Sequence, residues 1–272
     1  MSYEYPNLKL SKDPLSLVLC QVRFSAIRKM PDHIPDIQDR LRRKGFPIDA
    51  SGSGQTLVVT QGPEGMQTDV KPIRRDEFRS KDGHWSVSIG IDALSLVTTA
   101  YDRYKGFSEK LELCLQEVNA VAELNLCQVL RIGIRYIDVI EPSENETFRD
   151  YLKEPLHGLR SDVYLGGKQV IQSQTIGSTK MGTMSVRIWQ NNHGQLIPPD
   201  ILQGKPMPTL ASAEPGKLIT LVDTDHFVEG TWDFDIPKVL ETSNALHQGA
   251  NRAWFNDVIT PHALNKWGAT NA

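Results

Sequence analysis

Four arginines and two aspartates lie inside apolar segments typical of β-strands: Arg23, Arg131, Arg135, Arg187, Asp223 and Asp225, in QVRF, LRIGIRY, SVRIW and LVDTDHF. Charged side chains are seldom buried without a partner of opposite charge. Alternate residues of a strand face the same way, so Arg131 and Arg135 share a face. Asp223 and Asp225 share a face for the same reason. The pattern predicts a polar interior or groove in which arginines meet carboxylates.

These residues are compatible with three kinds of chemistry. First, the charges pair with one another and hold the strands in order, because an unpaired buried charge is strongly destabilising. Second, the guanidinium groups bind a phosphate, a nucleotide or a carboxylate through paired hydrogen bonds. That anion-binding cradle would consist of Gln21, Arg23, Arg131, Arg135 and Arg187. Third, Asp223 and Asp225 bind a metal ion for hydrolysis, although the adjacent His226 faces the opposite side of a regular strand.

The sequence lacks the short motifs of the common enzyme classes. It has no GxxxxGK[ST] phosphate loop, and Gly166-Gly167-Lys168 lacks both the spacing and the following hydroxyl. HExxH, CxxC, GxSxG and a strand-to-helix GxGxxG are also missing. Zinc hydrolysis, serine hydrolysis and dinucleotide binding are therefore disfavoured, and we expect no cofactor.

Composition excludes several further classes. The 272 residues are 39% hydrophobic and 23% charged with a net charge of −3, which excludes a disordered chain and disfavours a protein that coats nucleic acid. No apolar stretch approaches the roughly 20 residues of a membrane span, and the N-terminus does not resemble a secretory signal. Cys20, Cys114 and Cys127 lie in apolar runs, where cysteines usually remain free and buried. We expect a cytoplasmic protein without membrane contact.

Strands and helices alternate along the chain in a pattern that predicts the α+β class. The predicted strands are Leu15–Ile27, Thr56–Thr60, Arg74–Arg79, Trp85–Thr99, Leu130–Ile140, Gln169–Ile176, Thr183–Gln190 and Leu218–Phe227. A helix capped by Asp32 ends at Gly45, and a helix from Phe107 to Leu124 has an apolar stripe. The last long helix begins at its cap, Asp235, and contains His247, which we expect to pack in the core. The proline-rich segment from Ile197 to Pro215 predicts a surface loop.

The two halves of the chain, residues 1–128 and 129–272, share one element order: strand, helix, three strands, helix. Their first strands also match in part, with Gln21-Val22-Arg23-Phe24 in one and Gly133-Ile134-Arg135-Tyr136 in the other. This match predicts a pseudo-duplicated α+β unit with antiparallel sheets backed by two long helices. The halves could form two domains or one fused domain with a continuous curved sheet.

Four segments together resemble a sporadically distributed family of prokaryotic proteins, mostly of unknown function and roughly 250–270 residues long. They are Asp13-Pro14-Leu15 through Phe24, Leu130 through Ile140, Leu221 through Asp225, and Leu246-His247 followed by Trp254-Phe255 and Ile259-Thr260. The family's first strand usually has an acidic residue where this chain has Leu17. The resemblance implies no established reaction, and the patchy distribution is similar to that of defence and toxin–antitoxin loci.

Three functional hypotheses follow. The first is a non-catalytic binding protein, an accessory or neutralising partner of a protein encoded in the same locus. The second is a sensor of a nucleotide or another small anion that uses the strand arginines. The third is a metal-dependent hydrolase that uses Asp223 and Asp225. Nucleic acid is a less favoured partner because the net charge is slightly negative.

Overall fold

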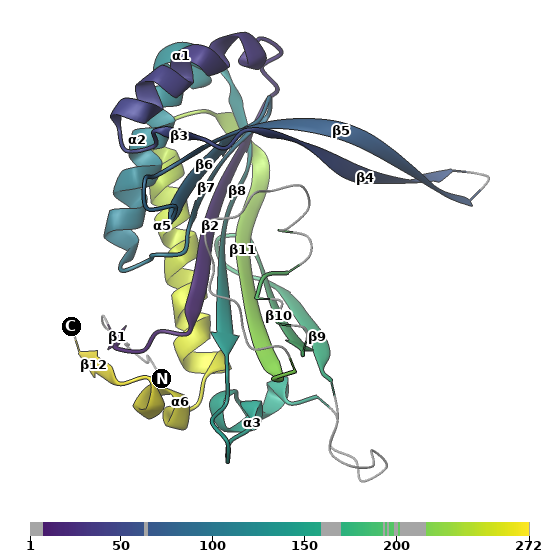
Figure 1. Ribbon diagram of the computed structural model, residues 1–272, viewed down its shortest axis with the longest axis vertical. Coiled ribbons are helices and arrows are strands. Elements are labelled where there is room, and N and C mark those ends of the chain that lie inside the picture. The colour runs from purple at the N-terminus through teal and green to yellow at the C-terminus, as the bar shows by residue number, and fades with distance from the viewer. Residues whose placement is uncertain are drawn as a thin grey trace.

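The strands of both halves join in one antiparallel sheet, seen edge-on in Figure 1. The structure is a computed structural model that describes residues 8–62, 65–158, 170–192, 194, 196–198, 201 and 216–271. Its ten-stranded sheet has the order β3-β5-β6-β7-β2-β8-β11-β10-β9, with β4 joined to β5. A separate pair, β1 (Leu8–Leu10) with β12 (Ala269–Asn271), brings the two ends of the described chain together. The predicted α+β class is confirmed.

The first half contributes one side of the sheet. Its elements are β2 (Leu15–Phe24), α1 (Met30–Arg43), β3 (Ile48–Asp49), β4 (Gly52–Gly62), β5 (Gly65–Arg79), β6 (Trp85–Ile89), β7 (Ala93–Thr98) and α2 (Tyr104–Ala122). Two predicted boundaries were wrong. Helix α1 begins at Met30 without a side-chain cap from Asp32, because Pro31 already occupies its first turn. The predicted strand from Trp85 to Thr99 is a hairpin, since the Gly90 N–H donates to the Ala93 carbonyl and closes a turn.

The second half contributes the other side. Its elements are a 3₁₀ turn (Leu124–Leu126), β8 (Gln128–Ile140), α3 (Phe148–Tyr151), a second 3₁₀ turn (Glu154–Leu156), β9 (Gln172–Ser178), β10 (Thr183–Asn191), β11 (Ile219–Asp233), α5 (Ile236–Ala253), a π-helical turn (Trp254–Val258) and α6 (Pro261–Lys266). Asp235 caps α5 as predicted, because its side chain accepts the Lys238 N–H at 2.8 Å.

Strand order mirrors about the central pair β2–β8, with β7, β6 and β5 on one side and β11, β10 and β9 on the other. Gln21 lies opposite Gly133 in that pair, and these are the residues that the sequence match aligns. The two matching segments therefore lie antiparallel around a local two-fold axis. Duplication of one ancestral unit stays a prediction.

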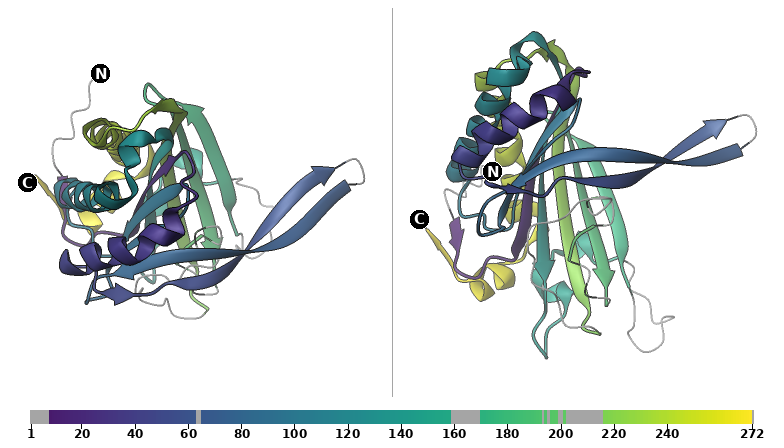
Figure 2. Two further views of the ribbon diagram at one scale, coloured as in Figure 1. Left: turned by 90° about the horizontal axis from the view of Figure 1, so that it is seen from above. Right: turned by 45° about the horizontal axis from the view of Figure 1, so that its top comes forward.

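Helices α1, α2 and α5 all cover the same face of the sheet, which we call the helix-covered face (Figures 1 and 2). The predicted stripe of α2 is fully buried there: Phe107, Leu111, Cys114, Leu115, Val118 and Ala122. It packs on apolar strand residues such as Val22 and Leu94, together with Ile37 of α1 and Leu246 of α5. Alternation along β2 and β8 supplies these residues, because every second side chain faces the helices.

The opposite, helix-free face has its own apolar cluster. Leu19, Ile137 and Leu221 pack there against Ile197 and Ile201, which are 3% and 2% exposed. The prediction of a surface loop from Ile197 to Pro215 was therefore wrong for these two residues, since they cover the sheet. Residues 202–215 lie outside the described part of the chain.

One hairpin extends away from the rest of the molecule (Figures 1 and 2). It consists of β4 and the first part of β5, paired without interruption from Gly52↔Arg75 to Gly62↔Gly65. Only the last residues of β5, Asp76 to Arg79, pair with β6. We call the hairpin of residues 52–75 the β4–β5 arm.

Candidate functional site

The predicted meeting of arginines and carboxylates lies on the helix-free face, across β8, β11 and β10. Asp223 of β11 faces Arg187 of β10 in register, and Asp225 faces Arg135 of β8. Arg135 donates to both oxygens of Asp223, with Nε to Oδ1 at 2.7 Å and the second nitrogen to Oδ2 at 2.8 Å. Arg187 donates from Nε to the same Oδ2 at 2.7 Å. One buried carboxylate of β11 thus bridges two guanidinium groups on the two strands that flank it.

A third arginine extends this group along β8. Arg131 donates to Asp225 Oδ2 at 3.1 Å and lies 3.9 Å from Glu229. Its guanidinium lies over the Phe227 ring, 4.4 Å from the centroid. Gly133 makes this position possible, because a Cβ there would lie 2.6 Å from a guanidinium nitrogen of Arg131. We call Arg131, Arg135, Arg187, Asp223 and Asp225 the strand ion-pair network.

Burial makes the pairing in this network important for stability. Asp223 is 3% exposed, and the side chains of Arg135 and Arg187 are 12% and 34% exposed. Charges removed from water to this extent are stable only with good geometry and satisfied hydrogen bonds. Burial raises the pKa of Asp225, and the nearby arginines act in the opposite direction. The network therefore holds three neighbouring strands in register.

The other two residues of the predicted cradle do not join the network. Arg23 lies opposite Arg131 in the β2–β8 ladder, but its nearest charged partner is Asp92 at 3.5 Å. Gln21 donates from Nε2 to Ser95 Oγ at 3.1 Å. Both contacts lie within the first half of the molecule. The structure brings together three of the five cradle residues and places the other two beside different partners.

A metal site does not form from Asp223, Asp225 and His226 in this arrangement. His226 faces the helices, where its Nδ1 donates to the Leu246 carbonyl at 2.7 Å and its Nε2 accepts from Thr179 Oγ1 at 2.8 Å. Burial lowers the pKa of His226, which keeps it neutral for this pattern. Within the described ranges, no group of three His, Cys, Asp or Glu side chains is close enough to bind a metal ion.

A second polar cluster, which the sequence did not predict, lies on the helix-covered face. The Tyr136 hydroxyl is 2.7 Å from Nδ1 of His247, and the Tyr104 ring stacks on that imidazole with centroids 4.2 Å apart. The Tyr104 hydroxyl donates to Ser243 Oγ at 3.0 Å, and Cys20 Sγ lies 3.6 Å from that Ser243 oxygen. Burial lowers the pKa of His247 to about 4, so the imidazole is neutral and its Nδ1 can accept a hydrogen bond from the Tyr136 hydroxyl. The expected core position of His247 agrees with this packing.

One carboxyl of β8 is buried on the same face: Asp138 is only 4% exposed. Burial raises the pKa of Asp138 well above its ordinary value, and the Asp13 and Asp223 carboxyls raise it further. Folding therefore favours the protonated form of Asp138.

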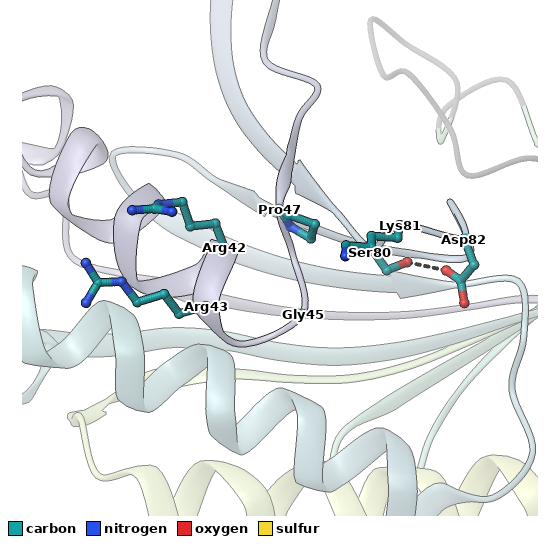
Figure 3. Close-up of a pocket in the computed structure, with 7 residues that line it drawn as sticks. All are labelled: Arg42, Arg43, Gly45, Pro47, Ser80, Lys81 and Asp82. Atoms are coloured by element: carbon teal, nitrogen blue, oxygen red, sulfur yellow. Dashed lines mark hydrogen bonds between the residues drawn. The ribbon is translucent and has the colours of Figure 1, made fainter.

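The end of α1 and the β5–β6 turn enclose a shallow hollow of about 430 Å³, shown in Figure 3. Arg42, Arg43 and Lys81 line it, but the two arginines point away from Lys81 and form ion pairs with Asp39. These two arginines thus have a partner within their own helix, and Arg40 of the same turn pairs with Glu117 of α2. These cations do not converge on one position, as a phosphate site would require.

Comparison of the sequence with protein-family models and with curated proteins found no match. No helix in the described portion is long and apolar enough to cross a membrane.

Proposed function

We propose that this chain is a non-catalytic binding protein that contacts a protein partner through the β4–β5 arm. The observation that carries the proposal is the extension of this hairpin away from the sheet (Figure 2). Among the described strands, β4 pairs only with β5, and residues 65–75 of β5 pair only with β4. A two-stranded hairpin is marginally stable in water unless something packs on it. A partner surface would supply that packing.

The backbone of the arm offers two unpaired strand edges for such a partner. An exposed edge presents a row of N–H and C=O groups to which a further strand can add. The arm therefore suits a partner that presents an extended segment or a groove. The resemblance to a sporadically distributed prokaryotic family supports a partner encoded in the same defence or toxin–antitoxin locus, which this chain would assist or neutralise.

An anion sensor is the alternative, and the strand ion-pair network supports it less. Both oxygens of Asp223 already accept hydrogen bonds from the guanidinium groups of Arg135 and Arg187. A phosphate would have to displace that carboxylate and leave it buried without a partner, which is strongly unfavourable. The hydrolase hypothesis has no supporting geometry in the described residues.

The experiment is a capture of host proteins by the tagged chain with and without its arm. Residues 55–72 are replaced by Asn-Gly, which joins the paired residues Gly54 and Ile73 through a two-residue hairpin turn. We expect the shortened chain to fold with a similar melting temperature and to lose the captured partner. The control variant Arg42→Ala changes the hollow near α1, and we expect it to capture the partner as the wild type does. Capture by the shortened chain at the wild-type level would contradict the proposal.

A further inference from the structure

Within the described residues, the strand at the far edge of the sheet, β9, has no charge, proline or bulge to protect that edge. Natural edge strands are shortened, bulged, charged or interrupted by proline. β9 reads QSQTIGS, with no charge and no proline, and pairs with β10 over seven consecutive positions without a bulge. Among the described strands β10 is its only neighbour, and all seven residues are exposed. The outer edge of β9 is thus a regular template for another strand.

Exposed apolar side chains accompany this edge. Val170, Ile176 and Met181 are 65%, 63% and 39% exposed. They are three of the seven large exposed apolar residues in the described parts, and all belong to β9 or its flanking turns. Of the three, Ile176 lies within β9 itself, so its exposed side chain is available for an apolar contact at this edge.

We propose that β9 pairs antiparallel with β9 of a second copy of this chain, centred on Thr175. Thr175 is the middle of the seven residues, so this register uses the whole strand. It places Thr175 opposite its own copy and Gln174 opposite Ile176 of the other chain. The two Ile176 side chains then become diagonal neighbours on one face, within reach of each other. The sheet continues through the dimer as β10-β9-β9-β10.

The sequence of β9 favours a copy of itself as the occupant. Antiparallel self-pairing of a charged strand places like charges near one another, and β9 has no charge to oppose this pairing. The register also brings together the exposed Ile176 side chains and pairs threonine with threonine, a favourable cross-strand pair. A closed two-fold pairing is the commonest symmetry of soluble assemblies. This inference does not depend on the proposed partner of the arm.

The first test is sedimentation of the full chain at about 100 μM, a concentration suited to a small interface. We expect a dimer that Ile176→Lys converts to a monomer, because two ammonium groups would replace the apolar contact. Leu126→Lys is the matched control: Leu126 is 75% exposed and outside the β9 hairpin, so this variant should remain dimeric. A monomeric wild-type chain, or a dimer that Ile176→Lys leaves intact, would overturn the proposal.

The second test checks the register by disulfide cross-linking in a Cys127→Ser background, since Cys20 and Cys114 are buried. Thr175→Cys should form a covalent dimer under copper phenanthroline, because each cysteine faces its own copy. Gln172→Cys should not, because the two copies of residue 172 would lie about 20 Å apart. Equal cross-linking of both variants, or cross-linking of Gln172→Cys alone, would contradict the proposed pairing.

Discussion

The two faces of β8 hold polar groups in different ways. On the helix-free face, Arg131 and Arg135 keep their charges and pair with aspartates of the adjacent strand. On the helix-covered face, the Tyr136 hydroxyl contacts His247, and burial raises the pKa of Asp138 well above its ordinary value. Ion pairs form where the arginines keep some exposure, and beneath the helices burial favours the uncharged form of the carboxyl that the same strand carries. Access to water thus decides which kind of polar residue each face tolerates.

The largest expected effect comes from removal of the carboxylate that bridges two arginines. Asp223→Ala leaves Arg135 and Arg187 without their shared partner, and we expect it to lower the free energy of unfolding by about 3–5 kcal/mol. Urea unfolding measures this change. Asp92→Ala is the matched control, because it removes the half-exposed pair with Arg23 and should cost less than about 1 kcal/mol.

The anion-sensor alternative predicts a different result for the same variant. If the arginines served a ligand, Asp223→Ala would free them, and a nucleotide or phosphoester panel would then raise the melting temperature more than in the wild type. We expect no such increase. A small loss of stability combined with stronger anion binding would contradict the structural role of the network.

A smaller loss of stability is expected from a substitution on the helix-covered face. Tyr136→Phe removes the hydroxyl that contacts His247, and the buried ring nitrogen loses that hydrogen bond. We expect a loss of about 1–2 kcal/mol in urea unfolding. Adding His247→Leu should restore part of that loss, because both partners are then apolar. A double variant less stable than Tyr136→Phe would show that the imidazole stabilises the fold through its stacking on Tyr104 instead.

The smallest change in the free energy of unfolding should come from Asp138→Asn. The difference between variant and wild type depends on pH. The folded carboxyl holds its proton more tightly than the unfolded one, so stability falls as pH rises from the ordinary pKa of about 4 through the raised folded pKa. Asparagine does not titrate, so the stability of the variant does not fall with pH for this reason. We expect the variant to gain stability relative to the wild type as the pH rises above about 4. A stability difference that is constant with pH would contradict the raised pKa of Asp138.

Local patterns predicted the elements and part of the candidate site. The apolar stripe of α2, the Asp235 cap and the alternation of β8 are encoded within a few neighbouring residues, and the structure agrees with each. The meeting of arginines with aspartates followed from the same alternation. The alternation could not predict which arginine pairs with which aspartate, because register depends on strand order across the whole sheet.

Features that depend on distant contacts escaped prediction. His247 and Tyr136 are 111 residues apart, and only the packing of α5 on β8 brings them together. Burial of Ile197 and Ile201 depends on the apolar patch formed by β2, β8 and β11. The glycine-rich and proline-containing composition of residues 52–75 concealed the long pairing of the β4–β5 arm.

The most direct test of the proposed function is the affinity of the captured partner for the intact chain and for the chain with residues 55–72 replaced by Asn-Gly. Calorimetric titration of both with the purified partner gives the two dissociation constants. If the arm is the binding element, its loss weakens binding at least about 100-fold, or roughly 2.7 kcal/mol, while unfolding in urea stays unchanged. Equal affinities with both chains folded would contradict the proposed role of the arm.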